Sequence, residues 1–246
     1  MRSADFSSFA RLYAESRPSY PAELFAHVAS VVEPRALAWD CATGNGQAAL
    51  GVVEHFDRVV ATDVSEAQIA HAPRHPRVEY RVGRSESSDH ADASLDLVTV
   101  ASALHWLDEQ AFYREARRVL RPGGVLAAWS YHVAYAEPPF GEIFKRLYDD
   151  PLGPYFAPAA HLVDDRYEGV VLPGEPLRAG AFFATARWTL SQVLSFVRSW
   201  SGTQNYVKER GGDPVEAIAG DLEDLWQGRG GVQTLCWPLY LRLSRL

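Results

Sequence analysis

The sequence contains few cysteines, no long apolar run and no block of basic residues. Two cysteines, Cys41 and Cys236, in 246 residues are too few for a disulfide framework and favour a reducing compartment. No stretch is apolar for long enough to cross a bilayer, and residues 1–15 lack the apolar centre of a signal peptide. The net charge of −7 disfavours a nucleic-acid backbone as a partner. We therefore expect a cytoplasmic protein with no nucleic-acid partner and no membrane insertion.

The sequence does contain enough apolar material for a full core, arranged in alternating segments. Hydrophobic residues make up 47% of the chain, which is typical of a globular domain. In the first half, apolar runs typical of buried strands alternate with segments whose apolar residues recur at helical spacing. The strand-like runs are residues 36–40, 58–63, 78–83, 95–102 and 125–131, and the helix-like segments are residues 21–32, 46–56, 65–72 and 108–120. This alternation predicts a doubly wound α/β fold with a parallel sheet.

The alternation stops after residue 136, and residues 137–180 are rich in proline, glycine and aromatic residues. Beyond residue 136 the patterns predict helices over 140–150, 190–200 and 213–228, and strands over 180–190 and 236–246. Ser191 is a candidate N-cap, and Pro238 should lie near the start of its strand or at a sheet edge. The sequence of the second half therefore predicts helices and strands that are added to the end of the sheet.

A glycine-containing loop follows the first strand, in the stretch AWDCATGNGQAAL (residues 38–50). Gly44 and Gly46 would let a ligand approach the backbone, although two glycines can also serve only a tight turn. Asp63 ends the next strand, 23 residues after Asp40, where a carboxylate can accept hydrogen bonds from both ribose hydroxyls. The combination predicts an adenosine-containing ligand.

Three features favour S-adenosylmethionine over a nicotinamide dinucleotide. Asp40 precedes the glycines, and its carboxylate would repel a pyrophosphate but would tolerate a ligand that carries an ammonium and a sulfonium. Ser85 and Glu86 follow the third strand, where an adenine amino group could be bound. A Pro-Gly-Gly turn at residues 122–124 joins the last helix of the first half to its strand.

These motifs together resemble the class I S-adenosylmethionine-dependent methyltransferases. The matching stretches are DCATGNGQ (40–47), ATDVS (61–65), ALHWL (103–107) and EARRVLRPGGVL (115–126). FARLYAESRPSYP (9–21), RSWSGTQNY (198–206) and WPLYLR (237–242) extend the likeness to the small-molecule branch that contains trans-aconitate methyltransferase-like proteins. The resemblance implies a Rossmann-like, seven-stranded, mostly parallel sheet with a helical C-terminal decoration over the active site.

The same resemblance implies one domain over residues 1–246, divided into an N-terminal helical cap (1–36), a cofactor-binding core (37–136) and substrate-covering insertions with the last two strands (137–246). The residues that match the family's S-adenosylmethionine site are Tyr13, Arg17, Asp40, Gly44, Gly46, Asp63, Val64, Glu86, Ala101 and Ser102. Arg17 would pair with the cofactor carboxylate, or it would be an exposed arginine before Pro18.

Ala42 departs from the family pattern, which usually has glycine at this position. Because alanine adopts negative φ angles most comfortably, we expect an ordinary backbone at Ala42. The close approach of the ligand is then expected at Gly44 and Gly46.

Transfer of a methyl group from a sulfonium mainly requires that the acceptor be positioned and water excluded. A carboxylate acceptor needs no base, whereas a phenol, alcohol or carbon acceptor does. His105 is the candidate base; alternatively it shapes the pocket floor. The candidate substrate-binding residues are Trp106, Tyr131, Trp200 and Tyr206. No metal site is expected, because Pro73 interrupts the segment between His71 and His75.

The leading hypothesis is therefore a methyltransferase, monomeric or homodimeric, that acts on a small molecule, with O-methylation of a carboxylic acid as the expected reaction. The alternatives are a non-catalytic S-adenosylmethionine-binding module and a C-methyltransferase with a quinone or lipid-like acceptor.

Overall fold

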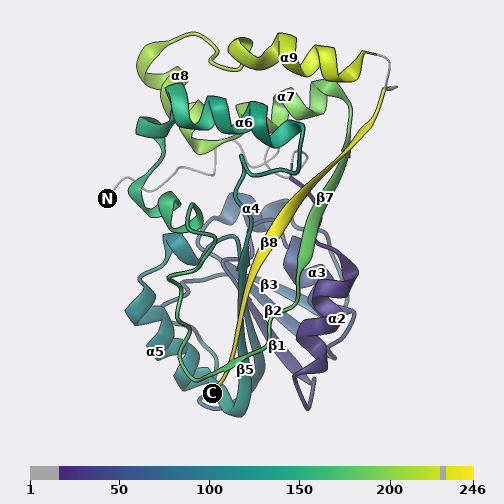
Figure 1. Ribbon diagram of the computed structural model, residues 1–246. Helices are drawn as coiled ribbons and strands as arrows, with labels where there is room; N and C mark the ends of the chain where they lie inside the picture. The colour runs from purple at the N-terminus through teal and green to yellow at the C-terminus, as the bar shows by residue number, and fades with distance from the viewer. Residues whose placement is uncertain (1–16, 228–230) are drawn as a thin grey trace.

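A computed structural model describes residues 17–227 and 231–246, and one mixed sheet forms the centre of these residues (Figure 1). Its strand order is β3-β2-β1-β4-β5-β8-β6, and β7 pairs with β8 outside this path. The strands are β1 (Leu37–Cys41), β2 (Arg58–Asp63), β3 (Val78–Val82), β4 (Leu95–Ala101), β5 (Leu120–Ser130), β6 (Glu175–Leu177), β7 (Phe182–Trp188) and β8 (Gln233–Arg245).

The first five strands are parallel, and helices cover both faces of this part of the sheet. The helices here are α2 (Ala22–Ser30), α3 (Gln47–Val53), α4 (Glu66–Ala70), α5 (Glu109–Val119) and the short turn η1 (Leu104–Trp106). The apolar sides of α2 and α3 pack in one core cluster, and that of α5 packs in a second cluster across the sheet. Six of the seven residues of β4 are buried, as expected for a strand covered on both faces. The predicted doubly wound α/β fold is confirmed.

The strand order reverses between β1 and β4, which are neighbours although β2 and β3 lie between them in the sequence. In sheets of this type ligands bind beyond the carboxyl ends of the strands at such a reversal. The loops after Cys41 and Ala101 meet at this point. The topology therefore places the glycine-containing loop beside Ala101 and Ser102, two other residues predicted for the cofactor site.

The sheet differs from the sequence prediction in two respects. Within the described residues it has eight strands instead of seven, because the three-residue strand β6 pairs with the end of β8. The Pro-Gly-Gly stretch at 122–124 lies inside the start of β5, and the register of β4 against β5 shifts between Leu95 and Leu97.

A helical layer lies over the carboxyl ends of the parallel strands (Figure 1). It consists of α6 (Phe140–Leu147), η2 (Tyr148–Leu152), η3 (Gly153–Tyr155), η4 (Pro158–Val163), α7 (Leu190–Arg198), α8 (Ser201–Arg210) and α9 (Glu216–Trp226). Helix α7 is capped by Thr189, whose side chain forms a capping box with Gln192, so the prediction of Ser191 as the cap is wrong. No helix was predicted at α8, whose buried residues are Gly202 and Thr203.

Strand β8 joins this helical layer to the sheet. Its residues 233–239 pair with β7, and its residues 240–245 pair antiparallel with β5. Pro238 lies in the part of β8 that pairs on one side only, where a missing N–H donor is tolerated. Throughout residues 17–227 and 231–246, no helix combines the length and the apolar character that a membrane span requires.

Candidate functional site

The loop after β1 contains three residues with positive φ, and one of them is not glycine. Ala42 has φ +53°, followed by Gly44 at +56° and Gly46 at +84°. The expectation of a negative φ at Ala42 is wrong, because the turn between β1 and α3 holds Ala42 in the left-handed region together with Gly44 and Gly46. Such a conformation costs an L-residue roughly 1–2 kcal/mol, and uncommon backbone conformations concentrate at ligand sites.

Replacing Ala42 by glycine should relieve this cost. We expect the free energy of unfolding to rise by about 0.5–1 kcal/mol, the gain being reduced by the greater flexibility of glycine in the unfolded chain. The measurement is urea denaturation. Ala38→Gly is the matched control, because Ala38 is buried in β1, where glycine should lower stability. An Ala42→Gly variant as destabilised as Ala38→Gly would contradict the positive φ.

The two glycines have different roles. A side chain at Gly44 would meet none of the described residues within 4 Å, whereas one at Gly46 would collide with the ring of Tyr80 from β3. The open space is therefore at Gly44, and Gly46 allows Tyr80 to pack against the loop and α3 to begin. A ligand resting on this loop would approach the backbone at Gly44.

Asp40 lies at the base of the loop and is completely buried. Its carboxylate accepts hydrogen bonds from the hydroxyls of Thr43 and Thr99, the latter at 2.6 Å. Burial raises the pKa of Asp40 to about 6, against the lowering effect of the two threonine hydroxyls. Because it is buried, Asp40 would influence a ligand on this loop only through the loop that it holds and through its charge.

Asp63 joins the ends of β1 and β2. One carboxylate oxygen accepts from the backbone N–H of Gly44 at 2.8 Å, and the other accepts from the N–H of Ser65 at 2.8 Å. The hydroxyl of Ser65 caps α4 by accepting from the N–H of Gln68, so Asp63 is not needed as a cap. Next to it, Val64 has 67% of its surface exposed, which leaves an apolar side chain available to a flat ligand.

The loop after β3 brings Ser85 and Glu86 toward the same end of the sheet. Ser85 is buried beside the thiol of Cys41, whose pKa is raised by burial. A Glu86 carboxylate oxygen accepts from the N–H of Asp108 at 3.4 Å, and Arg84 lies 3.7 Å from its second oxygen. A carboxylate that can accept hydrogen bonds therefore lies beyond the carboxyl end of β3, where the sequence analysis expected the adenine amino group.

The end of β4 is tied to the described start of the chain. Ser102 follows Ala101 with φ +52°, and its hydroxyl lies 3.0 Å from that of Tyr20. The carbonyl of Pro18 accepts from the side chain of Gln47 in α3, and Ser19 pairs with Thr185 of β7. The segment 17–20 therefore crosses from the glycine loop to the helical layer. Tyr13 lies outside the described residues.

A cavity with an empty volume of about 650 Å³, part of it open to solvent, adjoins this segment. It lies between the ends of β4 and β5 and the helical layer. Its lining residues are Arg17, Ser102, His105, Trp106, Ser130, Tyr131, His132, Val133, Tyr148, Phe156, Ala160, Val163, Trp200 and Ser201. The lining therefore includes predicted residues of the cofactor site, the candidate base and three of the four predicted substrate residues. Tyr206 is not among them; its ring packs on that of Tyr155, with centroids 5.0 Å apart.

His105 projects into this cavity from η1. Its Nδ1 is buried and has no hydrogen-bond partner among the described residues, and its ring centroid lies 4.8 Å from that of Trp106. Burial lowers the pKa of His105 to about 4, so the imidazole is neutral at pH 7. A neutral imidazole with an unused nitrogen can donate to or accept from a bound molecule.

Comparison with known proteins now identifies the chain. Residues 39–128 match the methyltransferase domain family. A Dictyostelium discoideum protein named as a methyltransferase is 30% identical over 98% of this chain and 94% of its own length. This chain belongs to the methyltransferase family. A solved structure of a protein assigned as a type II methyltransferase, from Anaeromyxobacter dehalogenans, is 36% identical and superposes with a TM-score of 0.84 over 93% of this chain and 97% of that one.

A Saccharomyces cerevisiae protein named as an S-adenosylmethionine-dependent methyltransferase is 24% identical over 82% of each chain. The predicted methyltransferase resemblance is thus confirmed, whereas the narrower likeness to trans-aconitate methyltransferase-like proteins stays a prediction. The family match ends at residue 128, but the Anaeromyxobacter structure also covers most of the helical layer.

This methyltransferase has a polar cluster in the cavity wall that the sequence analysis missed. Asp164, just after η4, accepts from the Nε2–H of His132 at 2.8 Å and from the hydroxyl of Tyr148 at 2.9 Å. The N–H of Ala134 donates to Nδ1 of His132, which fixes the tautomer. Partial burial alone would raise the pKa of Asp164, but hydrogen bonds from the histidines and Tyr148 lower it to about 2.

The cluster ties the end of β5, the end of α6 and η4 together around the cavity. His132 could have been found, because it stands immediately after the carboxyl end of a predicted parallel strand. Asp164 carried no comparable signal, since no helix or strand was predicted over residues 151–179 from which its position could be derived.

Proposed function

We propose that this methyltransferase transfers the methyl group of S-adenosylmethionine to a carboxylate of a small molecule and so forms a methyl ester. The observation that carries the proposal is the charge of the cavity lining. Arg17 is the one Lys or Arg among the described lining residues, and none of these residues is Asp or Glu. Asp164 lies behind His132 and Tyr148 and is not itself part of the lining. Because the charged side chain in this lining is a cation, the cavity favours an anionic acceptor.

The cofactor fits the loops around Gly44 and Asp63. A group can approach Gly44 because no part of residues 17–227 or 231–246 lies within 4 Å of where its side chain would be. Asp63 would accept from the ribose hydroxyls, and Glu86 would accept from the adenine amino group. Val64 would pack against the adenine ring, with Asp40 supporting the loop. When bound, S-adenosylmethionine supplies a methyl group that is already activated as a leaving sulfonium substituent. The segment that contains Arg17, with Ala101 and Ser102, would border its methionine part.

The chain's own residues then have to hold the acceptor and keep water out. The guanidinium of Arg17, which lies 5.5 Å above the ring of Phe196, would bind the acceptor carboxylate. Trp106, Tyr131 and Trp200 would enclose the body of the acceptor. A carboxylate is already nucleophilic, so no proton has to be removed, and His105 would only hydrogen-bond the acceptor. Positioning of this kind is the main contribution that such a transfer requires.

A second reaction is supported by His105 itself. Its buried Nδ1, which has no partner in the described part of the chain, is the arrangement expected of a base that receives a proton from a phenol, or from the carbon of a quinone or lipid-like acceptor. For such acceptors His105 would be catalytic and Arg17 would be less important. The two reactions therefore differ in which of the two residues is needed.

The test is a transfer assay with methyl-tritiated S-adenosylmethionine and a panel of carboxylic acids, phenols and lipid-like acceptors. We expect product with a carboxylic acid, and mild alkali should release its label as volatile methanol, because esters hydrolyse whereas methyl ethers and C-methyl groups do not. For that acid, Arg17→Met should raise KM at least about tenfold, the loss of a charge-assisted pair, and His105→Gln should keep most of kcat. Alkali-stable product that is lost in His105→Gln would establish the second reaction instead. Binding of S-adenosylhomocysteine without transfer to any acceptor would favour a non-catalytic binding module.

A further inference from the structure

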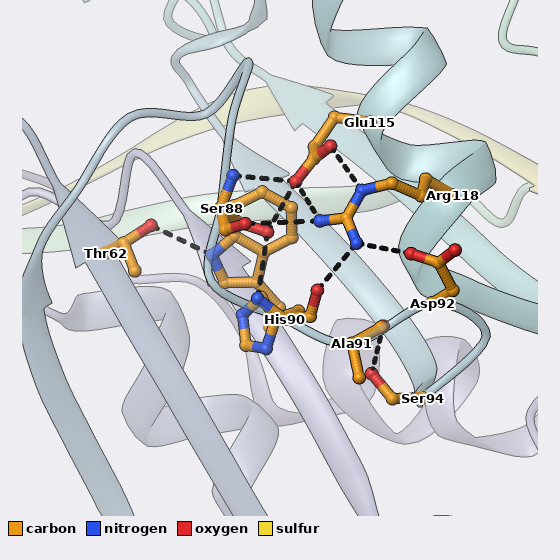
Figure 2. A network of polar contacts seen from close by, with 9 residues as sticks. Thr62, Ser88, His90, Ala91, Asp92, Ser94, Glu115 and Arg118 are labelled. Atoms are coloured by element: carbon orange, nitrogen blue, oxygen red, sulfur yellow. Dashed lines mark hydrogen bonds and ion pairs between the residues drawn. The ribbon is translucent and has the colours of Figure 1, made fainter.

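The loop between β3 and β4 is braced by two residues of α5 that belong to neither the cofactor loop nor the cavity. Arg118 donates to the carbonyls of Ser88 and His90 and to the carboxylate of Asp92 (Figure 2). Its remaining two donors bind Glu115, from Nε at 2.9 Å and from Nη2 at 2.6 Å. Every N–H of the guanidinium therefore has an acceptor.

Glu115 holds the same loop by its other contacts. Its Oε1 accepts from the backbone N–H of Ser88 at 2.7 Å and from the hydroxyl of Ser88 at 2.6 Å. The side chain of Glu115 is 8% exposed and that of Arg118 is 34% exposed, so the pair is shielded on one side. The hydrogen bonds from Arg118 and Ser88 lower the pKa of Glu115 to about 2, so it remains ionised.

The far side of the loop rests on the sheet. The ring of His90 packs on Trp39 of β1, with centroids 5.0 Å apart, and the indole N–H of Trp39 donates to Thr62. The backbone N–H groups of Ala93 and Ser94 donate to the carbonyls of Arg118 and Val119. Residues 88–94 are thus fixed from two directions.

Ser85 and Glu86 lie in the same loop, immediately before the fixed part. Gly83, at the start of the loop, donates to the carbonyl of Asp63, and the Glu86 carboxylate accepts from Asp108, the N-cap residue of α5. The position of the Glu86 carboxylate therefore depends on how α5 and the loop are held together. Arg118 and Glu115 do this without facing the cavity.

We propose that Glu115 and Arg118 are positioning residues for adenine recognition: they fix the 83–94 loop so that Glu86 accepts from the adenine amino group. This inference rests on the proposed use of S-adenosylmethionine. The brace requires the planar, five-donor guanidinium, because lysine offers three donors from a single point and cannot bind a carboxylate and three further acceptors at once. Arg118→Lys keeps the charge and removes this geometry.

The test compares S-adenosylhomocysteine with S-inosylhomocysteine, whose base has a carbonyl in place of the adenine amino group. Isothermal titration calorimetry on the full chain should show the wild type preferring S-adenosylhomocysteine by at least about tenfold, since a carbonyl would face the Glu86 carboxylate. In Arg118→Lys the affinity for S-adenosylhomocysteine should fall about tenfold and the preference should drop to about threefold or less. Arg117→Lys is the matched control, because Arg117 is the preceding residue and is exposed.

The preference ratio separates positioning from a general loss of structure. A ratio in Arg118→Lys equal to that of Arg117→Lys would overturn the proposal, whether or not both ligands bind more weakly. Glu115→Gln, which keeps the shape of the side chain and removes its charge, provides a second variant with the same expected change if Arg118→Lys does not fold. If the wild type binds S-adenosylhomocysteine but Arg118→Lys and Glu115→Gln keep the same preference ratio as Arg117→Lys, the brace alone is rejected and the proposed function stands. A wild type that does not bind S-adenosylhomocysteine would reject the proposed function and the brace together.

Discussion

Replacing Asp63 by alanine is expected to weaken the binding of S-adenosylhomocysteine on the order of 100-fold, the largest effect on ligand affinity that we expect. The side chain would lose its hydrogen bonds to both ribose hydroxyls. It would also leave the N–H groups of Gly44 and Ser65 without the acceptors that they have in the structure. The loss therefore combines a direct contact with the geometry of the glycine loop. Isothermal titration calorimetry measures it.

Asp57→Ala is the matched control, because Asp57 is exposed and lies just before the opposite end of the same strand. It should leave the affinity unchanged. Asp63→Asn should give an intermediate loss, since one oxygen remains as an acceptor. An Asp63→Ala variant that binds as tightly as the control would remove Asp63 from the cofactor site.

Replacing Asp40 by asparagine is expected to stabilise the protein at pH 8 relative to the wild type, and to do so much less at pH 4. The pKa of Asp40 rises from 3.8 to about 6 on folding, because burial disfavours the charged form. The folded state therefore binds this proton more tightly, and ionisation lowers stability as the pH rises from about 4 through 6. At 1.36 kcal/mol per pKa unit, the difference amounts to about 3 kcal/mol at pH 8.

Asparagine keeps the side-chain shape and can still hydrogen-bond Thr43 and Thr99, but it carries no charge. Urea denaturation of both proteins at pH 4 and pH 8 gives the change in their stability difference. Glu115 and Asp164, whose pKa values are lowered to about 2, lose stabilisation as the pH falls in both proteins, and their effects cancel in the comparison. A stability difference that is the same at both pH values would show that the pKa of Asp40 is not raised.

The parallel half of the fold was predictable because its signals are local and repeated. Continuous apolar runs such as β4 can be interpreted as buried parallel strands when helical segments separate them. The second half was less predictable for physical reasons. Helix α8 has no apolar stripe along one side, and β6 is too short for a period. The capping box at Thr189 depends on Gln192, a pairing that the sequence analysis did not weigh against Ser191.

The residues of the candidate site also divide into those that local sequence signals could predict and those that they could not. Asp40, Asp63 and Glu86 could be found because each lies at or shortly after the carboxyl end of a strand, and parallel strands bring these ends together. Ala42 was assigned the wrong backbone because residue preference favours negative φ, whereas the turn geometry of the loop overrides that preference. Tyr206 was assigned to the pocket from its residue type, but residue type gives no direction, and the side chain packs on Tyr155. Asp164 depends on contacts between segments far apart in the sequence.

Strand β8 has a consequence for attempts to reduce this protein to a smaller unit. The residues that match the family, 39–128, contain the glycine loop, strands β2 to β4 and most of β1 and β5. Among the described residues, β8 alone pairs with the side of β5 that faces away from β4. A fragment that ends near residue 136 would expose the backbone donors and acceptors of β5 together with the buried Trp129. Such an unprotected apolar edge recruits other chains. Antiparallel pairing from the far end of the sequence thus protects the cofactor-binding half against aggregation.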